Sequence, residues 1–519
     1  MTGYEWTRRG VIGGAGALLL GARDLAAAFA GADPFTLGVA SGEPSADGIV
    51  LWTRLAPVPL APDGGMPPRP AAVRWELADN AGFANPRSGT VRAEPGWGHS
   101  VHVEVAGLRP GRDYWYRFIT GGIASPVGRT CTAPPRGALA QRLRFAFASC
   151  QNYEAGHYAA YRHMVADAPD LIVFLGDYIY EAAPGEGKTR KHPTPAARDL
   201  GSYRARYATY KLDPALQAAH QAAPWITTWD DHEVADNYAN ALDKRHGDRA
   251  AFLRRRADAY QAYYEHMPLP RRMRPDGPTL KLYRTLDWGG LAQFQIVDDR
   301  QYRDPPPCQL PGAIERHLDA IWLRPDCPER RDPRRSLLGP AQEKWLDAAL
   351  TKTAARWNLL TQPTLMMPYQ RIDPATPDAA PGVYSTDGWE GYPASRERII
   401  RRWRDARTPN PMVLSGDVHA FIVGDHVDPD AKQRVLAAEF VGGSLTSTNN
   451  DAPLKRATAL NPNFHFAEKD VRGYALVELT PAAAQVRFRG LANARDPASP
   501  VSDLARFAVA NGRPGAQTG

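Results

Sequence analysis

The stretch that decides the fold is Leu171-Ile172-Val173-Phe174-Leu175-Gly176-Asp177-Tyr178-Ile179-Tyr180-Glu181. Its first five residues are all apolar, which is typical of a strand buried on both faces of a sheet. The strand ends at Gly176 and is followed at once by Asp177, whose carboxylate offers two hard oxygen ligands. In open α/β sheets, ligands bind in the crevice beyond the carboxyl ends of the strands. We therefore expect Asp177, and Tyr180 three residues later, to face a ligand site.

The same arrangement recurs at three other places in the chain. An apolar run over residues 144–149 leads into Cys150, a second over 224–229 leads into Asp230-Asp231-His232-Glu233, and a third over 411–416 leads into Asp417-Val418-His419. Four strands that each end in metal-ligand residue types form one candidate site. The candidate metal ligands are Cys150, Asp177, Tyr180, Asp231, Asn237, Asp417 and His419. Asp230 and Asp236 are the neighbouring alternatives to Asp231 and Asn237.

These ligand types do not all suit one ion. Thiolate, phenolate and imidazole suit a transition metal, and phenolate favours ferric iron. Carboxylate and amide oxygens suit calcium, magnesium or manganese. The pattern therefore predicts a mixed cluster in which Asp177 bridges two ions, an arrangement that can clamp a phosphate group and lower the pKa of a bound water molecule.

The rest of the chain predicts two structured regions and a tail. Residues 33–135 contain turn signals and alternating apolar segments, which indicate a small all-β sandwich without evident chemistry. Residues 141–495 alternate strands with helices such as 250–266 and a helix that starts at Gly339-Pro340, which indicates an α/β core with two sheets. In the tail, residues 496–519, we expect a short apolar helix over 503–509 and a mobile polar end.

The first 30 residues read as a targeting segment. Thr7-Arg8-Arg9-Gly10-Val11-Ile12 carries a twin-arginine pair, a weakly hydrophobic stretch follows, and Ala28-Phe29-Ala30 offers a cleavage site. No other segment approaches the length of apolar chain that a membrane span requires. We therefore expect a protein without a transmembrane segment that the twin-arginine machinery exports to the periplasm or the medium.

The composition of the chain limits the classes of ligand that we expect the protein to bind. The chain has 519 residues, a net charge of +7 and four cysteines. The charge suits anionic ligands, but no dense Lys/Arg run or nucleic-acid motif is present, so we do not expect nucleic acid as a specific ligand. Arg254-Arg255-Arg256 fits the solvated face of a helix. Four cysteines are too few for a disulfide scaffold, although Cys308 and Cys327 could pair outside the cytoplasm.

The motifs resemble those of the PhoD family of alkaline phosphatases, which is related to purple acid phosphatases and other metallophosphatases. The resemblance covers roughly residues 35–491. It rests on Phe35-Thr36-Leu37-Gly38-Val39-Ala40-Ser41-Gly42-Glu43-Pro44, Leu51-Trp52-Thr53-Arg54, Ser149-Cys150-Gln151, Gly176-Asp177-x-x-Tyr180, Trp229-Asp230-Asp231-His232-Glu233, Asp299-Arg300-Gln301-Tyr302-Arg303 and Ser415-Gly416-Asp417-Val418-His419.

The resemblance implies α-β-β-α layers, a site that binds Fe³⁺ together with Ca²⁺, and hydrolysis of phosphomonoesters with activity on phosphodiesters. Cys150, Tyr180 and His419 would bind iron, Asp177 would bridge, and Asp231, Asn237 and Asp417 would hold calcium. His232 and Arg300 would be catalytic residues. For His232 the alternative is an ordinary capped histidine, and for Arg300 an ion pair with Asp298 or Asp299.

Three alternatives stay open on the sequence alone. The metal ions could be Zn²⁺ or Mn²⁺ rather than iron and calcium. The enzyme could be a phosphodiesterase that acts, like a phospholipase D, on lipid or cell-wall phosphodiesters. The third alternative is a metal-stabilised binding protein that binds its partner through the sandwich domain. The full set of metal-ligand residue types argues against it.

Overall fold

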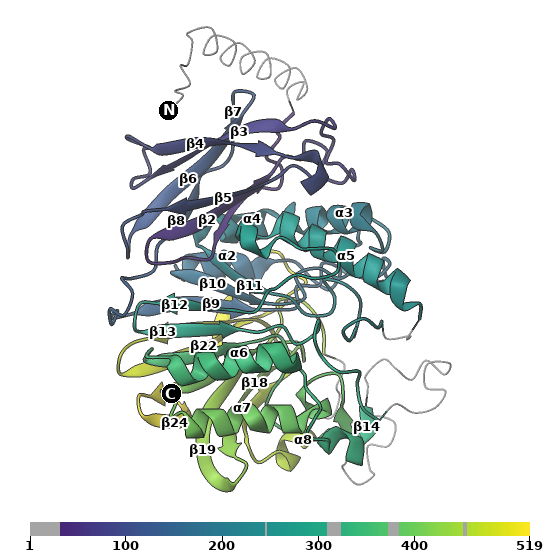
Figure 1. Ribbon diagram of the computed structural model, residues 1–519, viewed down its shortest axis with the longest axis vertical. Helices are drawn as coiled ribbons and strands as arrows, with labels where there is room; N and C mark the ends of the chain where they lie inside the picture. Colours follow the sequence, from purple (N-terminus) through teal and green to yellow (C-terminus); the bar gives the residue numbers. More distant parts are fainter. Residues whose placement is uncertain (1–31, 244–246, 309–322, 372–382, 450–453) are drawn as a thin grey trace, which may run out of the picture.

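The computed structural model describes residues 32–243, 247–308, 323–371, 383–449 and 454–519 (Figure 1). The predicted twin-arginine segment at residues 1–30 lies outside this range. None of the described helices is both long and apolar enough to cross a membrane.

A ten-stranded sheet runs through most of the molecule. Its order is β24 (Arg513–Thr518), β23 (Val501–Ala510), β22 (Ala483–Leu491), β21 (Arg472–Leu479), β9 (Leu143–Ala148), β10 (Leu171–Leu175), β11 (Trp225–Thr228), β1 (Val39–Gly42), β2 (Gly48–Arg54) and β5 (Ser100–Ala106). Strands β9, β10 and β11 are parallel, with Val173 opposite both Phe147 and Ile226. Because parallel strands end at one edge of a sheet, the residues that follow β9, β10 and β11 are brought together.

A second sheet of seven strands lies beneath the first. Its order is β12 (Arg284–Trp288), β13 (Ala292–Ile296), β15 (Trp357–Thr361), β17 (Pro411–Ser415), β19 (Ala431–Gly442), β18 (Phe421–Asp428) and β20 (Phe464–Glu468). Strands β13, β15, β17 and β19 are parallel neighbours. The predicted strands over residues 291–297 and 357–361 are confirmed as β13 and β15.

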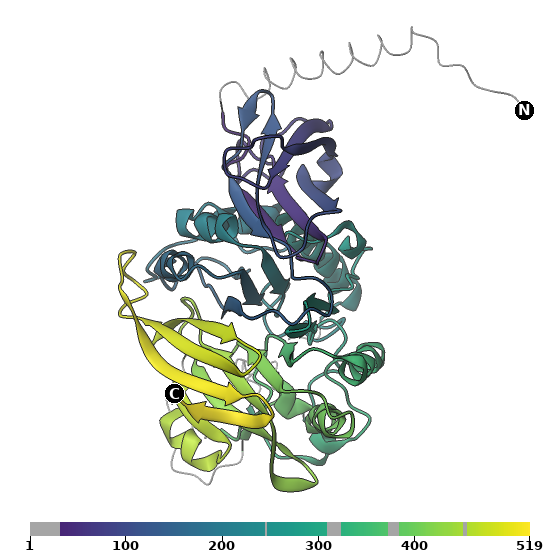
Figure 2. The ribbon, with the colours of Figure 1, turned by 90° about the vertical axis from the view of Figure 1, so that its left-hand side faces the viewer.

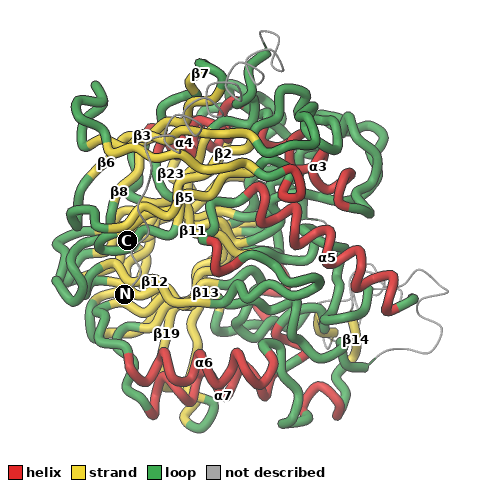
Figure 3. The backbone as a smooth tube through the Cα atoms, turned by 45° about the horizontal axis from the view of Figure 1, so that its top comes forward, coloured by secondary structure: helices red, strands yellow, loops and turns green. Residues whose placement is uncertain are grey.

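Alternate residues of the central strands enter different cores. In β10, Leu171, Val173 and Leu175 pack between the two sheets, whereas Ile172 and Phe174 pack against helices. The helices on that outer face are α2 (Ala159–Ala166), α3 (Leu200–Lys211), α4 (Pro214–Ala222) and α5 (Arg249–His266). Helices α6 (Gly339–Lys352) and α7 (Pro393–Asp405) cover the outer face of the seven-stranded sheet (Figure 3). The predicted α-β-β-α layers are confirmed.

The N-terminal strands form a sandwich that is continuous with the core. Strands β4 (Arg87–Ala93), β3 (Ala71–Ala78), β6 (Asp113–Thr120) and β7 (Ile123–Ala124) form one sheet, in which β8 (Gly128–Cys131) also pairs with β6. Its core is shared with β1, β2 and β5, which extend the ten-stranded sheet. Gly42 of β1 lies opposite Trp225 of β11, and a Cβ at Gly42 would come within 2.7 Å of the Pro268 carbonyl oxygen. Glycine therefore permits the approach that joins the two parts, which are stacked along the long axis (Figure 2).

The predicted C-terminal helix is wrong. Residues 501–510 form strand β23, and residues 513–518 form β24, at the edge of the ten-stranded sheet (Figure 2). Phe507 and Val509 are buried in the core between the sheets, whereas Ala508 and Ala510 are half-buried. This alternation of buried and half-buried residues lets the segment pair with β22. Strand pairing thus outweighs the helical propensity of a short alanine-rich segment.

Two further expectations meet different outcomes. Cys308 and Cys327 form a disulfide with their Cα atoms 6.5 Å apart, as the sequence suggested. Arg256, by contrast, is buried rather than solvated, and its Nη1 donates to the Asn240 carbonyl over 2.6 Å. Arg256 lies on the buried face of α5 with Phe252, Ala259 and Tyr260, so one of the three consecutive arginines faces inward.

Candidate metal centre

The loops that follow β9, β10, β11 and β17 meet at one place. The amide of Cys150 donates to the Gly176 carbonyl over 3.1 Å, and the amide of Gln151 donates to the Asp177 carbonyl over 3.1 Å. Gly176 has φ +105°, and a Cβ there would lie 2.6 Å from the Asp230 amide nitrogen. Glycine thus allows the loops after β10 and β11 to touch, which brings Asp177 beside the Asp230-Asp231 pair.

Backbone strain is concentrated at the predicted ligands. Left-handed φ values occur at Cys150 (57°), Asp177 (57°), Asn237 (56°), Asp417 (62°) and His419 (52°). Asn, Asp and His adopt the left-handed conformation more often than other non-glycine residues, whereas it is uncommon for Cys. Such residues cost of order 1–3 kcal/mol each and are found mainly where function requires their geometry. The strain therefore supports a functional role for these loops.

One group of donors gathers Cys150, Asp177 and His419. One ligand atom from each lies within 4.8 Å of the others. The Tyr180 hydroxyl joins them, because it lies 2.8 Å from Asp177 Oδ2 and 3.2 Å from His419 Nε2. These are the thiol, phenol and imidazole that the sequence predicted as iron ligands, together with the predicted bridging carboxylate.

A second group lies on the other side of Asp177. Ligand atoms of Asp177, Asp231 and His232 also lie within 4.8 Å of one another. The amide of Asn237 donates to Asp231 Oδ2 over 2.6 Å, which holds the Asn237 loop beside this carboxylate. Asp177 is thus common to both groups, and its Oδ1 is buried with no hydrogen-bond partner among the described residues. A buried carboxylate oxygen without a partner is a position that a cation would satisfy, so the residues fit a two-metal site bridged by Asp177.

Arg300 is buried beneath these carboxylates and does not reach the solvent-facing side of the site. Its guanidinium pairs with Asp230 through Nε and with Asp387 through Nη1 at 2.8 and 2.9 Å. Its Nη2 lies 3.5 Å from Asp231 and 3.9 Å from Asp417. The side chain is 0% exposed, so it has no surface for contact with a substrate. Its predicted catalytic role is not supported by this position, and its partners are not the predicted Asp298 and Asp299 side chains.

The same arrangement distinguishes Asp231 from Asp230. The Asp230 carboxylate pairs with Arg300 through Oδ1, and its Oδ2 is buried without a partner among the described residues, whereas Asp231 belongs to the second donor group. Asp417 is the most accessible of these carboxylates, with 31% of its side chain exposed. The geometry therefore favours Asp231 and Asp417 as ligands, with Asp230 as a buried support.

The electrostatics of the site are dominated by excess negative charge. Burial, with the carboxylates of Asp231, Glu233 and Asp417, raises the pKa of Asp177 well above its usual value, and burial raises that of Asp417 to about 7. Burial also raises the pKa of Cys150, and lowers that of His419 to about 4. Neutral imidazole is the form that ligates metals. Bound cations would supply the missing positive charge and release the protons that the thiol and carboxyls otherwise keep.

His232 is held by an acidic partner that the sequence did not assign. Glu181 Oε2 lies 2.7 Å from His232 Nδ1, and its Oε1 accepts from the Asp236 amide over 2.9 Å. Burial alone would lower the pKa of His232, but Asp231, Asp177 and Glu181 raise it well above its usual value. The side chain is 19% exposed, so unlike Arg300 it can reach a substrate. Glu181 directly follows Tyr180 in the opening stretch, and that position was the only signal for it.

Glu233 is a second residue whose role the sequence did not predict. It is buried, and its carboxylate accepts the amides of Asp177 (3.1 Å), Tyr178 (2.5 Å) and Asp230 (2.8 Å). It therefore ties the loop after β10 to the loop after β11. Burial raises its pKa to about 7. The glutamate lies in the quoted Asp230-Asp231-His232-Glu233 segment, but only the structure shows that it faces the backbone rather than the ligands.

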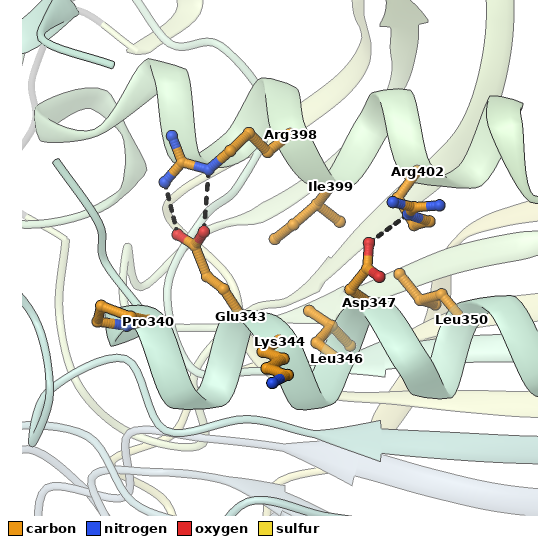
Figure 4. A pocket seen from close by; sticks show the side chains of 9 residues that line it. All are labelled: Pro340, Glu343, Lys344, Leu346, Asp347, Leu350, Arg398, Ile399 and Arg402. Atoms are coloured by element: carbon orange, nitrogen blue, oxygen red, sulfur yellow. Dashed lines mark hydrogen bonds and ion pairs between the residues drawn. The ribbon is translucent and has the colours of Figure 1, made fainter. Parts of the chain in front are cut away.

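A cavity of about 320 Å³ between α6 and α7 lies elsewhere, on the outside of the seven-stranded sheet (Figure 4). Leu346, Leu350 and Ile399 line it, and its two carboxylates are paired with arginines across the helices. Glu343 accepts from Arg398 at 2.7 and 2.9 Å, and Asp347 pairs with Arg402. These carboxylates and arginines form ion pairs with one another, so this cavity has the features of a helix–helix groove rather than of a reaction centre.

Comparison with known proteins identifies the family. The model of the PhoD-like phosphatase family matches residues 145–488, and that of its N-terminal domain matches residues 22–134. The chain belongs to the PhoD-like phosphatase family. It is 44% identical to alkaline phosphatase D of Bacillus subtilis (strain 168) over 486 residues, covering 91% of this chain and 80% of the relative. A solved structure described as the structure of PhoD superposes with a TM-score of 0.87 at 42% identity, covering 94% of this chain and 92% of the other. The predicted family is confirmed, and the chain is an enzyme of that family.

Proposed function

We propose that this enzyme is an exported, metal-dependent alkaline phosphatase that hydrolyses phosphomonoesters to release inorganic phosphate, with weaker activity on phosphodiesters. The observation that carries the proposal is the position of Asp177, which belongs to both donor groups and keeps one buried carboxylate oxygen without a partner in the described part of the chain. The identity to alkaline phosphatase D supports the choice of monoesters.

The two predicted ligand sets differ in chemistry, so we assign them different ions. Cys150, Tyr180 and His419 would hold Fe³⁺, because thiolate, phenolate and imidazole suit a transition metal. Asp231, Asn237 and Asp417 would hold Ca²⁺, which prefers oxygen ligands. Asp177 would bridge the two ions. Zn²⁺ or Mn²⁺ at both positions is the alternative that metal analysis would reveal.

The protein's own residues position the reaction. When bound, such a pair of ions would polarise the phosphoryl oxygens and lower the pKa of an attacking water molecule. Glu181 holds His232 Nδ1, so the Nε2 atom of this partly exposed ring is left to face the substrate. We assign Nε2 the delivery of a proton to the leaving-group oxygen, a task that histidine performs in many hydrolases. Arg300 and Glu233 act indirectly, by fixing the carboxylates and the loops that carry them.

Export by the twin-arginine machinery to the periplasm or the medium is part of the proposal. It is motivated by the arginine pair in residues 7–12 and by the Cys308–Cys327 disulfide, which suits an oxidising compartment. A fusion of residues 1–30 to a reporter that functions only after folded export tests this part. Signal with the native segment and none with Arg8 and Arg9 changed to Lys is the expected result.

The activity is tested by turnover of phenyl phosphate and diphenyl phosphate at matched concentrations by the purified, metal-loaded enzyme. We expect the monoester to be hydrolysed faster. A clear preference for the diester would favour the phosphodiesterase alternative. Asp177→Asn should abolish both activities, whereas Asp79→Asn, at an exposed ion pair of the N-terminal domain, should retain them.

A further inference from the structure

A segment far along the chain contacts three of the residues assigned to iron. Residues 443–448 follow β19 and lie against the loop after β9. The amides of Thr446 (3.4 Å) and Ser447 (3.2 Å) and the Ser447 hydroxyl (2.9 Å) all approach the Cys150 carbonyl. The Thr448 carbonyl lies 3.0 Å from Nδ1 of His419. With Nδ1–H donated to this carbonyl, Nε2 keeps its lone pair for a metal, which is the usual arrangement around metal-ligating histidines.

Ser447 also reaches the tyrosine. Its Oγ is 2.7 Å from Oη of Tyr180, and the serine is buried. The Tyr180 hydroxyl donates to Asp177 Oδ2 over 2.8 Å, so the phenol oxygen can accept the Ser447 proton, for which the Cys150 carbonyl is the competing acceptor.

We propose that Ser447 is a positioning residue that donates a hydrogen bond to the phenolate of Tyr180 in the iron-loaded enzyme and thereby limits electron donation from this ligand to the iron. The inference rests on the proposed function, since it requires Tyr180 to bind iron. On metal binding the phenol proton leaves to solvent, and the phenolate can then only accept hydrogen bonds. A hydroxyl that bonds an anion makes a stronger bond than one that bonds a carbonyl, so the Ser447 proton is directed to Tyr180 rather than to Cys150.

The consequence is spectroscopic. A tyrosinate bound to ferric iron gives a visible charge-transfer band whose energy depends on how tightly the phenolate holds its electrons. A hydrogen bond to the phenolate oxygen stabilises those electrons and moves the band to shorter wavelength. Its removal should therefore move the band to longer wavelength, and should lower the reduction potential of the iron because a more basic ligand stabilises the ferric state.

The test compares the visible spectra of the iron-loaded wild type, Ser447→Ala, Ser447→Thr and Thr446→Val. We expect a shift to longer wavelength in Ser447→Ala. Ser447→Thr keeps a hydroxyl and should restore the wild-type band. Thr446→Val is the matched control, because it removes a hydroxyl of the same segment that bonds the Asn152 carbonyl (2.7 Å), and it should leave the band in place.

The outcomes separate this inference from the proposed function. A band that keeps its wavelength in Ser447→Ala overturns the inference and leaves the iron assignment standing. A wild-type enzyme that holds iron but shows no band overturns Tyr180 as a ligand and the inference with it. If Ser447→Ala does not fold, resonance Raman spectra of the wild type in H₂O and D₂O decide. A deuterium shift of the phenolate C–O stretch supports the hydrogen bond, and an unshifted mode contradicts it.

Discussion

The hydroxyl of Tyr180 donates to Oδ2 of Asp177 over 2.8 Å, while Oδ1 of the same carboxylate is buried and has no partner in the residues that the structure describes. The two residues are three positions apart, and the left-handed backbone at Asp177 turns the chain so that both side chains face one space. One carboxylate oxygen thus points toward the thiol, phenol and imidazole group, and the other remains for the second group. This relationship makes Asp177 the centre of the proposed reaction site.

Substitution of His232 should have an effect that depends on the leaving group. We expect His232→Gln to lower kcat on an alkyl phosphate about 10²- to 10⁴-fold, the range for loss of a general acid. The effect on p-nitrophenyl phosphate should be much smaller, because p-nitrophenolate leaves without protonation. Steady-state kinetics on both substrates make the comparison. An equal loss on both would show that His232 holds the phosphoryl group instead.

Substitution of Glu181 should act through His232. Glu181→Gln keeps the size of the side chain but removes the charge that lies 2.7 Å from His232 Nδ1. We expect kcat on an alkyl phosphate to fall about 10- to 100-fold, as for outer partners of functional histidines. The double variant Glu181→Gln, His232→Gln should be little worse than His232→Gln alone, because the two residues act as one unit. Additive losses would contradict this coupling.

Loss of Arg300 should destabilise the protein. Arg300→Met would leave the buried carboxylates of Asp230 and Asp387 without their shared cation, and breaking such a pair costs about 3–5 kcal/mol. Urea denaturation of the metal-free protein measures the change in the free energy of unfolding. The matched control is Arg402→Met, which breaks a partly exposed pair with Asp347 and should cost about 0–1 kcal/mol. A fully stable but inactive Arg300→Met would instead restore the catalytic role.

Lys211 should make the stability depend on pH. This lysine is buried, with its amine 4.2 Å from the Trp52 ring centroid and 3.4 Å from His220 Nε2, and burial lowers its pKa to about 7. The folded state therefore binds fewer protons here than the unfolded state between pH 7 and 10.5, so stability rises with pH through this window. Relative to Lys211→Met, the wild type should gain up to about 4 kcal/mol between pH 7 and 10. An unchanged difference in the free energy of unfolding across that window would contradict the lowered pKa.

The sequence was sufficient for the parts of the fold in which local pattern and tertiary environment agree. The five apolar residues of β10 are buried on both faces, so a continuous apolar run identified the strand and located Asp177 at its end. Residues 250–266 were predicted as a helix and lie within α5. For residues 503–509 the local pattern did not decide the structure, because a short alanine-containing segment can form a helix or a strand. Pairing with β22 makes it a strand.

The candidate site, like the fold, could be predicted only where the local sequence carries a signal. Residues directly after strands were found, because the end of a strand is itself a sequence signal. Ser447 also follows a strand, β19, but serine is not among the metal-ligand residue types, so the sequence did not mark it. The burial of Arg300 was also not predictable from the sequence, because its partners Asp230 and Asp387 come from two distant loops.

Anomalous X-ray scattering at the iron edge, from crystals of the purified mature enzyme, tests the central claim most directly. The account predicts one iron peak bounded by Cys150 Sγ, Tyr180 Oη, His419 Nε2 and a carboxylate oxygen of Asp177, with a second ion that does not scatter as iron on the Asp231 side of Asp177. A structure with Zn²⁺ or Mn²⁺ at both positions, or with iron that Tyr180 and Cys150 do not touch, would contradict it.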